Sequence, residues 1–225
     1  PKTMMILKAE DLDNVFNSNK KLRLNMDVCS IDLINRELSQ TLGLEPKYHI
    51  FVELENDKGN IKGTDFEKFT KLKNQIYKKA AMRRFYVLEN AKFLVDSMQD
   101  FLVYLESKKI PYFSHLASGC VYFMFLPEEI DKREEALKFA KKLNGRVAYN
   151  FGVGLTHKKY LEPGEKELIK RVKIRLDKHN KFNIEKVIDS DFESLKRKNI
   201  QIIKELPEPE PLIKEEKPET VEQII

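Results

Sequence analysis

The sequence has little cysteine, no long hydrophobic run and no glycine-rich phosphate loop. Its two cysteines, Cys29 and Cys120, are too few for a disulfide framework or a zinc site, which favours a reducing, cytoplasmic location. The longest apolar run, residues 121–126, falls far short of the ~18 residues that a membrane span needs, so any membrane association would come through partners. The N-terminus lacks the apolar segment of a secretory signal. Because no phosphate loop follows the first predicted strand, we expect no dinucleotide-binding or nucleotide-hydrolysing domain.

Charge is unevenly distributed along the 225 residues. Lys and Arg number 41 and Asp and Glu number 36, which gives a net charge of +5. Residues 205–225 hold seven Glu and two Lys, a net charge of −5, so the rest of the chain carries +10. Four of the nine prolines also lie in this segment, which predicts an extended acidic tail whose apolar end could contact a partner protein.

The basic body raises the question of nucleic-acid binding. Its densest basic segment, residues 166–178, contains no aromatic residue, and no nucleic-acid motif is present. Apolar residues recur there at helical spacing, at Leu168, Ile169, Val172 and Leu176, and predict a helix with that face packed inward. We therefore interpret the lysines as a solvated helix face and expect no nucleic-acid partner.

Periodicity predicts alternating strands and helices. The expected strands are residues 3–8, 22–28, 48–54, 85–88, 110–116, 120–126 and 146–150. The expected helices are residues 11–17, 31–41 (capped by Ser30), 64–81 (capped by Thr64), 91–107, 131–143 and one beginning at Pro163. The direct hairpin between residues 110 and 126 favours an α+β fold, with an antiparallel or mixed sheet and helices packed on one face.

Two stretches resemble a known family. Residues 145–161 (GRVAYNFGVGLTHKKYL) and 171–187 (RVKIRLDKHNKFNIEKV) are similar to the end of the C-terminal domain of FAD-linked oxidases, the family of D-lactate dehydrogenase and the glycolate oxidase flavoprotein subunit. The second stretch keeps Asp177, Asn183 and Lys186 of the family's ending. Upstream, residues 113–122 (FSHLASGCVY) resemble the family's Gly-His-x-Gly-Asp-Gly-Asn-x-His motif.

The resemblance implies a function that needs a partner. It covers most of residues 1–190 and implies a ferredoxin-like cap domain over the FAD of a separate domain, followed by a linker at 191–204 and the tail at 205–225. The family's FAD domain is absent from this sequence, so the chain is either a fragment or a subunit that works with an FAD-binding polypeptide. The implied reaction is the oxidation of a 2-hydroxy acid, and we expect no activity from this chain alone.

This sequence departs from the family's motifs at the residues expected to bind a metal and to act as the base. In the family, two His and one Glu hold a divalent metal, and an adjacent His is the base. Here His115 matches the first ligand, whereas Tyr122 and Asn150 stand at the other ligand positions and Phe151 at the base. We therefore expect no metal and no general base, with His115, Tyr122 and Asn150 as a degenerate catalytic set. Cofactor contact is expected from Gly152, Gly154 and Asn183.

Local patterns also suggest ordinary structural roles. His115 is expected to be a hydrogen-bonded strand histidine, and Tyr122 a packing residue. His49 is expected to be exposed, and His157 and His179, which lie among lysines, to be solvated. Cys120 is interpreted as a buried apolar residue, because the sequence places no His beside it.

Three functions compete on these grounds. The first is the substrate-side domain or subunit of a flavin-dependent 2-hydroxy acid oxidoreductase. The second is a non-catalytic structural or assembly subunit of an oxidoreductase complex, which binds partners through its surface and acidic tail. The third is a nucleic-acid binder, which would show a steep salt dependence of binding.

Overall fold

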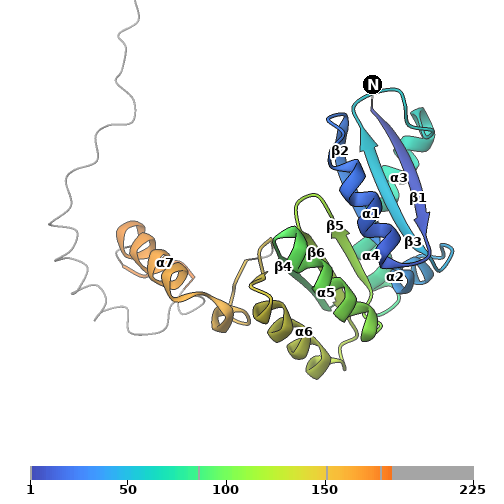
Figure 1. Ribbon diagram of the computed structural model, residues 1–225. Coiled ribbons are helices and arrows are strands. Elements are labelled where there is room, and N and C mark those ends of the chain that lie inside the picture. The colour runs from blue at the N-terminus through green and yellow to red at the C-terminus, as the bar shows by residue number, and fades with distance from the viewer. Residues whose placement is uncertain (1, 86, 151, 178, 184–225) are drawn as a thin grey trace, which may run out of the picture. The chain divides into compact units, whose positions relative to one another are not determined.

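The computed structural model describes residues 2–85, 87–150, 152–177 and 179–183, and the chain divides into two compact units, residues 1–160 and 161–225 (Figure 1). The described strands of the first unit are β1 (Thr3–Ala9), β2 (Val28–Ile34), β3 (Tyr48–Leu54), β4 (Val87–Lys92), β5 (Tyr112–His115), β6 (Cys120–Phe125) and β7 (Arg146–Val147). Its described helices are α1 (Leu12–Leu22), α2 (Arg36–Thr41), α3 (Gly63–Asn74), α4 (Ile76–Ala81), α5 (Val95–Ser107), α6 (Ile130–Lys142) and the 3-10 turn η1 (Lys158–Tyr160). The second unit contains α7 (Pro163–Leu176).

The strands form one sheet in the order β1-β3-β2-β5-β6-β4-β7, and all neighbouring strands are antiparallel. The segment from β4 to β7 runs strand, helix, strand, strand, helix, strand, which is the ferredoxin-like arrangement. Its edge strand β5 pairs with β2, so the first three strands extend the same sheet. The expected α+β class with a ferredoxin-like antiparallel sheet is confirmed.

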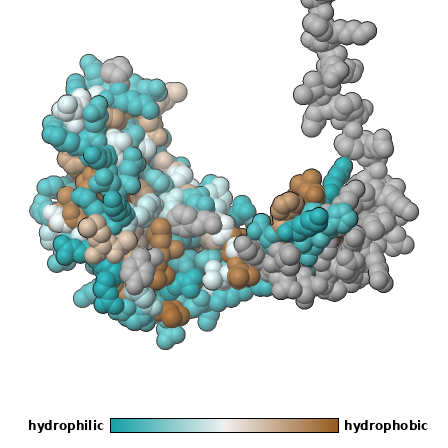
Figure 2. Space-filling model, turned by 180° about the vertical axis from the view of Figure 1, so that it is seen from behind, coloured by the Kyte–Doolittle hydropathy of each residue, from teal (hydrophilic) through white to brown (hydrophobic). Residues whose placement is uncertain are grey.

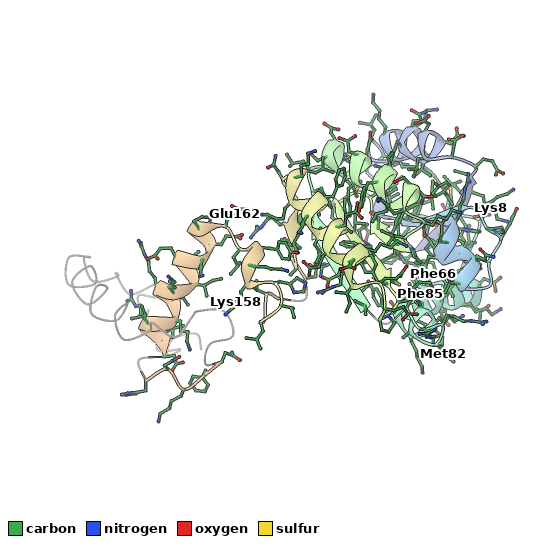
Figure 3. The ribbon with its side chains drawn as sticks, turned by 90° about the horizontal axis from the view of Figure 1, so that it is seen from below. Lys8, Phe66, Met82, Phe85, Lys158 and Glu162 are labelled. Atoms are coloured by element: carbon green, nitrogen blue, oxygen red, sulfur yellow. The ribbon has the colours of Figure 1, made fainter. Side chains whose placement is uncertain are left out.

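Helices lie on both faces of the sheet, whereas the sequence predicted helices on one face only. On what we call the first face, α1, α5 and α6 cover a core that includes the fully buried Phe101 and Phe123 (Figure 1). Truncating a phenylalanine of this kind to Ala typically costs ~3–5 kcal/mol of stability. On the second face, α2 and α4 pack against a smaller cluster around Phe51. Phe66 of α3 and Phe85 border that cluster (Figure 3).

The region between residues 22 and 41 differs from the expectation. The predicted strand at 22–28 is instead the end of α1 and a turn, in which Leu24 and Met26 are exposed. The strand is β2, and α2 is capped by Asn35, whose side chain accepts a hydrogen bond from the backbone of Leu38, rather than by Ser30. From Ile31 to Ile34, β2 is buried on both faces, and its sequence does not alternate between apolar and polar residues.

Other helices and strands also begin or end at residues that differ from the prediction. The helix expected at 64–81 is interrupted at Gln75, and Thr64 does not cap it, because α3 starts after Lys62 without a side-chain cap. The helix expected from residue 91 begins at Val95, because β4 continues to Lys92. Leu94, the residue before the helix, is exposed. The strand expected at 146–150 has only two residues, Arg146 and Val147. The next residue, Ala148, has a positive φ, which is not a strand conformation.

The second unit confirms one expectation and corrects another. Pro163 begins α7, and Glu162 and Glu165 form a capping box there. The apolar face expected to pack inward is instead largely exposed at Leu168, Val172 and Leu176, and the buried residue is Ile174. Figure 2 shows a hydrophobic patch on this helix. The linker at 191–204 and the tail at 205–225 lie outside the described residues.

Candidate functional site

A row of polar side chains crosses the second face of the sheet. Five residues of neighbouring strands are paired in register: Asp32 of β2, His115 of β5, Cys120 of β6, Lys92 of β4 and Arg146 of β7. Because directly opposite residues of antiparallel strands point to the same face, all five side chains project to one side of the sheet. We call this set the polar row. It lies opposite the face that α1, α5 and α6 cover.

Asp32 and His115 form the centre of the row. The Asp32 carboxylate is buried, and its Oδ1 lies 2.5 Å from Nδ1 of His115, whose side chain is 40% exposed. Burial by itself would raise the pKa of Asp32, but the hydrogen bond with His115 and the charge of Lys73 outweigh it and lower that pKa. An ionised carboxylate only accepts hydrogen bonds, so Nδ1 of His115 is the donor. Among the described residues, the other ring nitrogen, Nε2, has no hydrogen-bond partner.

Lys73 of α3 balances the buried charge. Its ammonium forms ion pairs with Asp32 and, at 2.5 Å, with Oε1 of Glu53 on β3. Burial opposes the charged form, but the attraction of Asp32 and Glu53 raises the pKa of Lys73. The imidazole of His115 is therefore oriented by a carboxylate that is itself fixed by a second buried charge.

The other two expected catalytic residues lie beside His115. The Tyr122 ring is 5.6 Å from the His115 ring, edge to face. The side-chain amide of Asn150 donates a hydrogen bond to the Tyr122 hydroxyl. The Asn150 backbone N–H in turn donates to Asn90 on β4, at 2.9 Å. The structure thus brings together His115, Tyr122 and Asn150, three residues that the sequence separates.

Aromatic side chains enclose this group. Phe113 lies 4.8 Å from His115, and Tyr77 of α4 lies 6.0 Å from Tyr122, measured between ring centroids. Burial raises the pKa of Tyr122, although the Asn150 hydrogen bond opposes that effect. Tyr122 is thus a protonated phenol at neutral pH that packs within the aromatic group.

The residues expected to contact a cofactor fall in both units. Gly152 and Gly154 have φ values of 74° and 50°, and a Cβ at either would meet no atom within 4 Å. Neither begins a helix that could bind a diphosphate, since η1 has three residues and α7 starts at Pro163. Both glycines therefore lie on open stretches of backbone whose positive φ favours glycine, and contact with a cofactor there stays a prediction.

Asn183 belongs to the second unit. It has a positive φ of 47° and lines a cavity of about 560 Å³ with Leu168, Val172 and Phe182. Asp177, at the end of α7, organises the turn before it by accepting hydrogen bonds from the backbone of Lys181 and Phe182. The hydrogen bond from Lys173 lowers the pKa of Asp177 to about 2. This part of the family-like ending is therefore a structured turn.

The ligand chemistry at the motif positions differs from that of a metal site. Nδ1 of His115 is engaged by Asp32, and Tyr122 and Asn150 offer a phenol and an amide. Within residues 2–85, 87–150, 152–177 and 179–183, no group of three or more His, Cys, Asp or Glu side chains is arranged to hold a metal ion.

Several residues of the site escaped sequence reasoning. Asp32 had one usable signal, since it is an acid inside the apolar stretch Ile31–Ile34. Lys73 and Glu53 had none, because a lysine on a helix and a glutamate on a strand are usually solvated. Cys120 was expected to have no histidine beside it, and this is wrong: His115 is its direct partner across the hairpin. The thiol is nevertheless buried.

Two other histidines also differ from expectation. His49 points away from Tyr48 and Ile50, but it is buried, and its Nδ1 lies 3.0 Å from the Ser39 hydroxyl of α2. Burial lowers the pKa of His49. His157 is mostly buried, and its Nε2 contacts Glu89 of β4 at 2.7 Å, while Arg133 of α6 holds the same carboxylate. His179 is exposed, as expected.

Comparison with known families and with curated protein sequences finds no match to this chain. Of the helices in the described ranges, none has the length and apolar character needed to cross a membrane.

Proposed function

We propose that the second face of the sheet is the substrate-facing side of a flavin-dependent oxidoreductase acting on 2-hydroxy acids, with FAD bound by a separate domain or polypeptide. One observation carries the proposal. The buried Asp32 carboxylate orients a half-exposed His115 beside Tyr122 and Asn150. These last three are the residues at the family's three metal-ligand positions, and their convergence in space supports the resemblance of the motifs.

The geometry also supports a candidate for the general base, which the sequence alone did not provide. Phe151 stands where the family's base is expected, but His115 has the features of a base: one nitrogen bonded to a buried carboxylate, and a partly exposed ring. In the proposed reaction, Nε2 of His115 takes the hydroxyl proton of the substrate. Asp32 then stabilises the imidazolium through Nδ1–H. A flavin, when bound, accepts the hydride from the substrate carbon.

The experiment that tests the proposal uses the full chain. We expect a tagged chain, purified from its native cells, to retain a second polypeptide that carries FAD. In that complex a 2-hydroxy acid should reduce the flavin, and His115→Gln should slow the reduction by ~10²-fold or more. Ser118→Ala, on the exposed hairpin turn, is the matched control and should leave the rate unchanged. A complex without flavin would contradict the proposal.

A second candidate function rests on a separate observation. The apolar side chains of Leu168, Val172 and Leu176 on α7 are exposed, which is unusual for a solvated helix and typical of a contact surface. This supports a non-catalytic assembly subunit of an oxidoreductase complex. In that case Leu168→Asp would release the chain from its complex, whereas His115→Gln would leave the activity of the complex unchanged.

A further inference from the structure

A cavity lies on the first face of the sheet, on the side away from the polar row. It has a volume of about 780 Å³ and is lined by α1, the turn after it and the first turns of α5, two of the helices that cover this face (Figure 1). Sites for small molecules typically measure roughly 300–1,000 Å³. The cavity therefore has the size of a ligand site, and the proposed reaction does not use it.

One buried amide at this cavity lacks a partner. Asn19 of α1 lines the cavity and is only 2% exposed. Its side-chain oxygen is buried and has no hydrogen-bond partner among the described residues. An unsatisfied buried polar group destabilises a fold, and native proteins keep few of them. A leucine would be the more stable residue at this position unless the amide binds something.

Charged side chains of both signs also line the cavity. Lys20 and Arg23 come from the end of α1, and the two acids are Asp13 and Asp96, in the first turns of α1 and α5. Among the described residues, none of these four forms an ion pair. A ligand with a single charge would meet like charges as well as opposite ones, whereas a zwitterion has a favourable partner for each of its charges.

Apolar side chains complete the lining. Phe16 of α1 and Val95 of α5 are partly buried and pack against the core of the first face. Leu24, in the turn after α1, lines the cavity and is 83% exposed. Contact with an apolar group of a ligand would remove this leucine from water, which is favourable. The cavity thus combines opposite charges, an unpaired amide and an apolar patch.

We propose that this cavity binds a free amino acid with an apolar side chain. The carboxylate of the ligand pairs with Arg23, whose planar guanidinium matches it through two hydrogen bonds, and Lys20 adds a second positive charge. The ammonium of the ligand pairs with Asp96 and donates to the side-chain oxygen of Asn19, which rotation about the last side-chain bond turns toward the cavity. The apolar side chain of the ligand contacts Leu24.

The test titrates L-leucine into the full chain and follows binding by calorimetry and by NMR chemical shifts. We expect saturable binding, with shifts in α1 and at the start of α5. Leucinamide lacks the carboxylate and N-acetyl-leucine lacks the ammonium, so each should bind ~10-fold or more weakly through the loss of a charge-assisted contact. The absence of saturable binding, or equal binding of the three compounds, would overturn the proposal.

Variants of the lining locate the site. Asn19→Leu should weaken leucine binding ~10-fold or more without lowering the stability of the chain, because an apolar group of similar size replaces an unsatisfied amide. Arg23→Met should remove the preference for leucine over leucinamide, and Asp96→Asn should remove the preference over N-acetyl-leucine. Arg83→Met, an exposed arginine after α4, is the charge-matched control and should keep the wild-type affinity. Wild-type affinity in Asn19→Leu would contradict the assignment of the cavity.

This site is independent of the proposed reaction. His115 belongs to the polar row on the second face, so His115→Gln should bind leucine as tightly as the wild-type chain does. Loss of leucine binding in that variant would place the amino acid on the second face and would overturn the site. Binding that depends on Asn19 and persists in His115→Gln would establish the site, even if no flavin accompanies the chain.

Discussion

Asp32 and His115 are 83 residues apart in the sequence and directly paired in the sheet, where a carboxylate oxygen of Asp32 meets Nδ1 of His115 at 2.5 Å. This pair joins the two halves of the sheet, since β2 belongs to the first three strands and β5 to the ferredoxin-like segment. The same contact that fastens the halves together also fixes the orientation of the imidazole. The predictions below follow from it.

Lys73→Met should destabilise the protein strongly. The substitution leaves the buried Asp32 and the partly buried Glu53 without their cation, and breaking a buried ion pair costs ~3–5 kcal/mol. Chemical denaturation measures the loss in the free energy of unfolding. Lys71→Met, on the same helix but exposed, is the control, with an expected change within ~0.5 kcal/mol. Similar stabilities of the two variants would refute the role of Lys73.

The stability of the protein should fall in acid partly because of Asp32. Its folded-state pKa is lower than its ordinary value of 3.8, so its contribution is complete above about pH 4 and is lost as the pH falls through the folded-state pKa. Asp32→Asn should therefore flatten the decrease in the free energy of unfolding below pH 4. Asp57→Asn, in an exposed turn, serves for comparison. An unchanged slope in Asp32→Asn would show that the carboxylate is not paired as described.

His115 should be protonated at Nδ1 when its ring is neutral. The ionised Asp32 carboxylate can only accept, and it faces this nitrogen. Nitrogen-15 NMR of the imidazole distinguishes the two tautomers directly. Asp32→Ala removes the acceptor and should abolish the preference. A proton on Nε2 in the wild-type chain would contradict the proposed role of Nε2 as the base.

The two cysteines should differ sharply in reactivity. Cys29 is exposed and Cys120 is buried in the polar row. A thiol reagent should modify one cysteine quickly and the second only as the protein unfolds. Cys29→Ser should remove the fast phase. Rapid modification of Cys120 in the native chain would mean that the second face is open down to β6.

The parts of the fold that could be predicted are those with a clear local pattern of apolar residues or a clear turn. β3 has apolar residues at every second position from Tyr48 to Leu54, and the β5–β6 hairpin combines two apolar strands with a short turn around Gly119, so sequence and structure agree there. β2 could not be recognised, because its sequence does not alternate between apolar and polar residues and its neighbours in the sheet come from distant segments. Local periodicity carries no information about such pairing.

The candidate site was predictable only in part. The motif resemblance identified His115, Tyr122 and Asn150, and the structure brings them together. It did not identify Asp32 or Lys73, because their roles arise from contacts made over long sequence distances.

The most direct test of the account is the rate at which a 2-hydroxy acid reduces the flavin in the complex that this chain forms with its partner. The account predicts that the wild-type complex contains FAD, that glycolate or D-lactate bleaches its absorbance, and that His115→Gln slows the bleaching by ~10²-fold or more while Ser118→Ala does not. A flavin that is reduced equally fast in the wild-type and His115→Gln complexes would contradict the role of the Asp32–His115 pair.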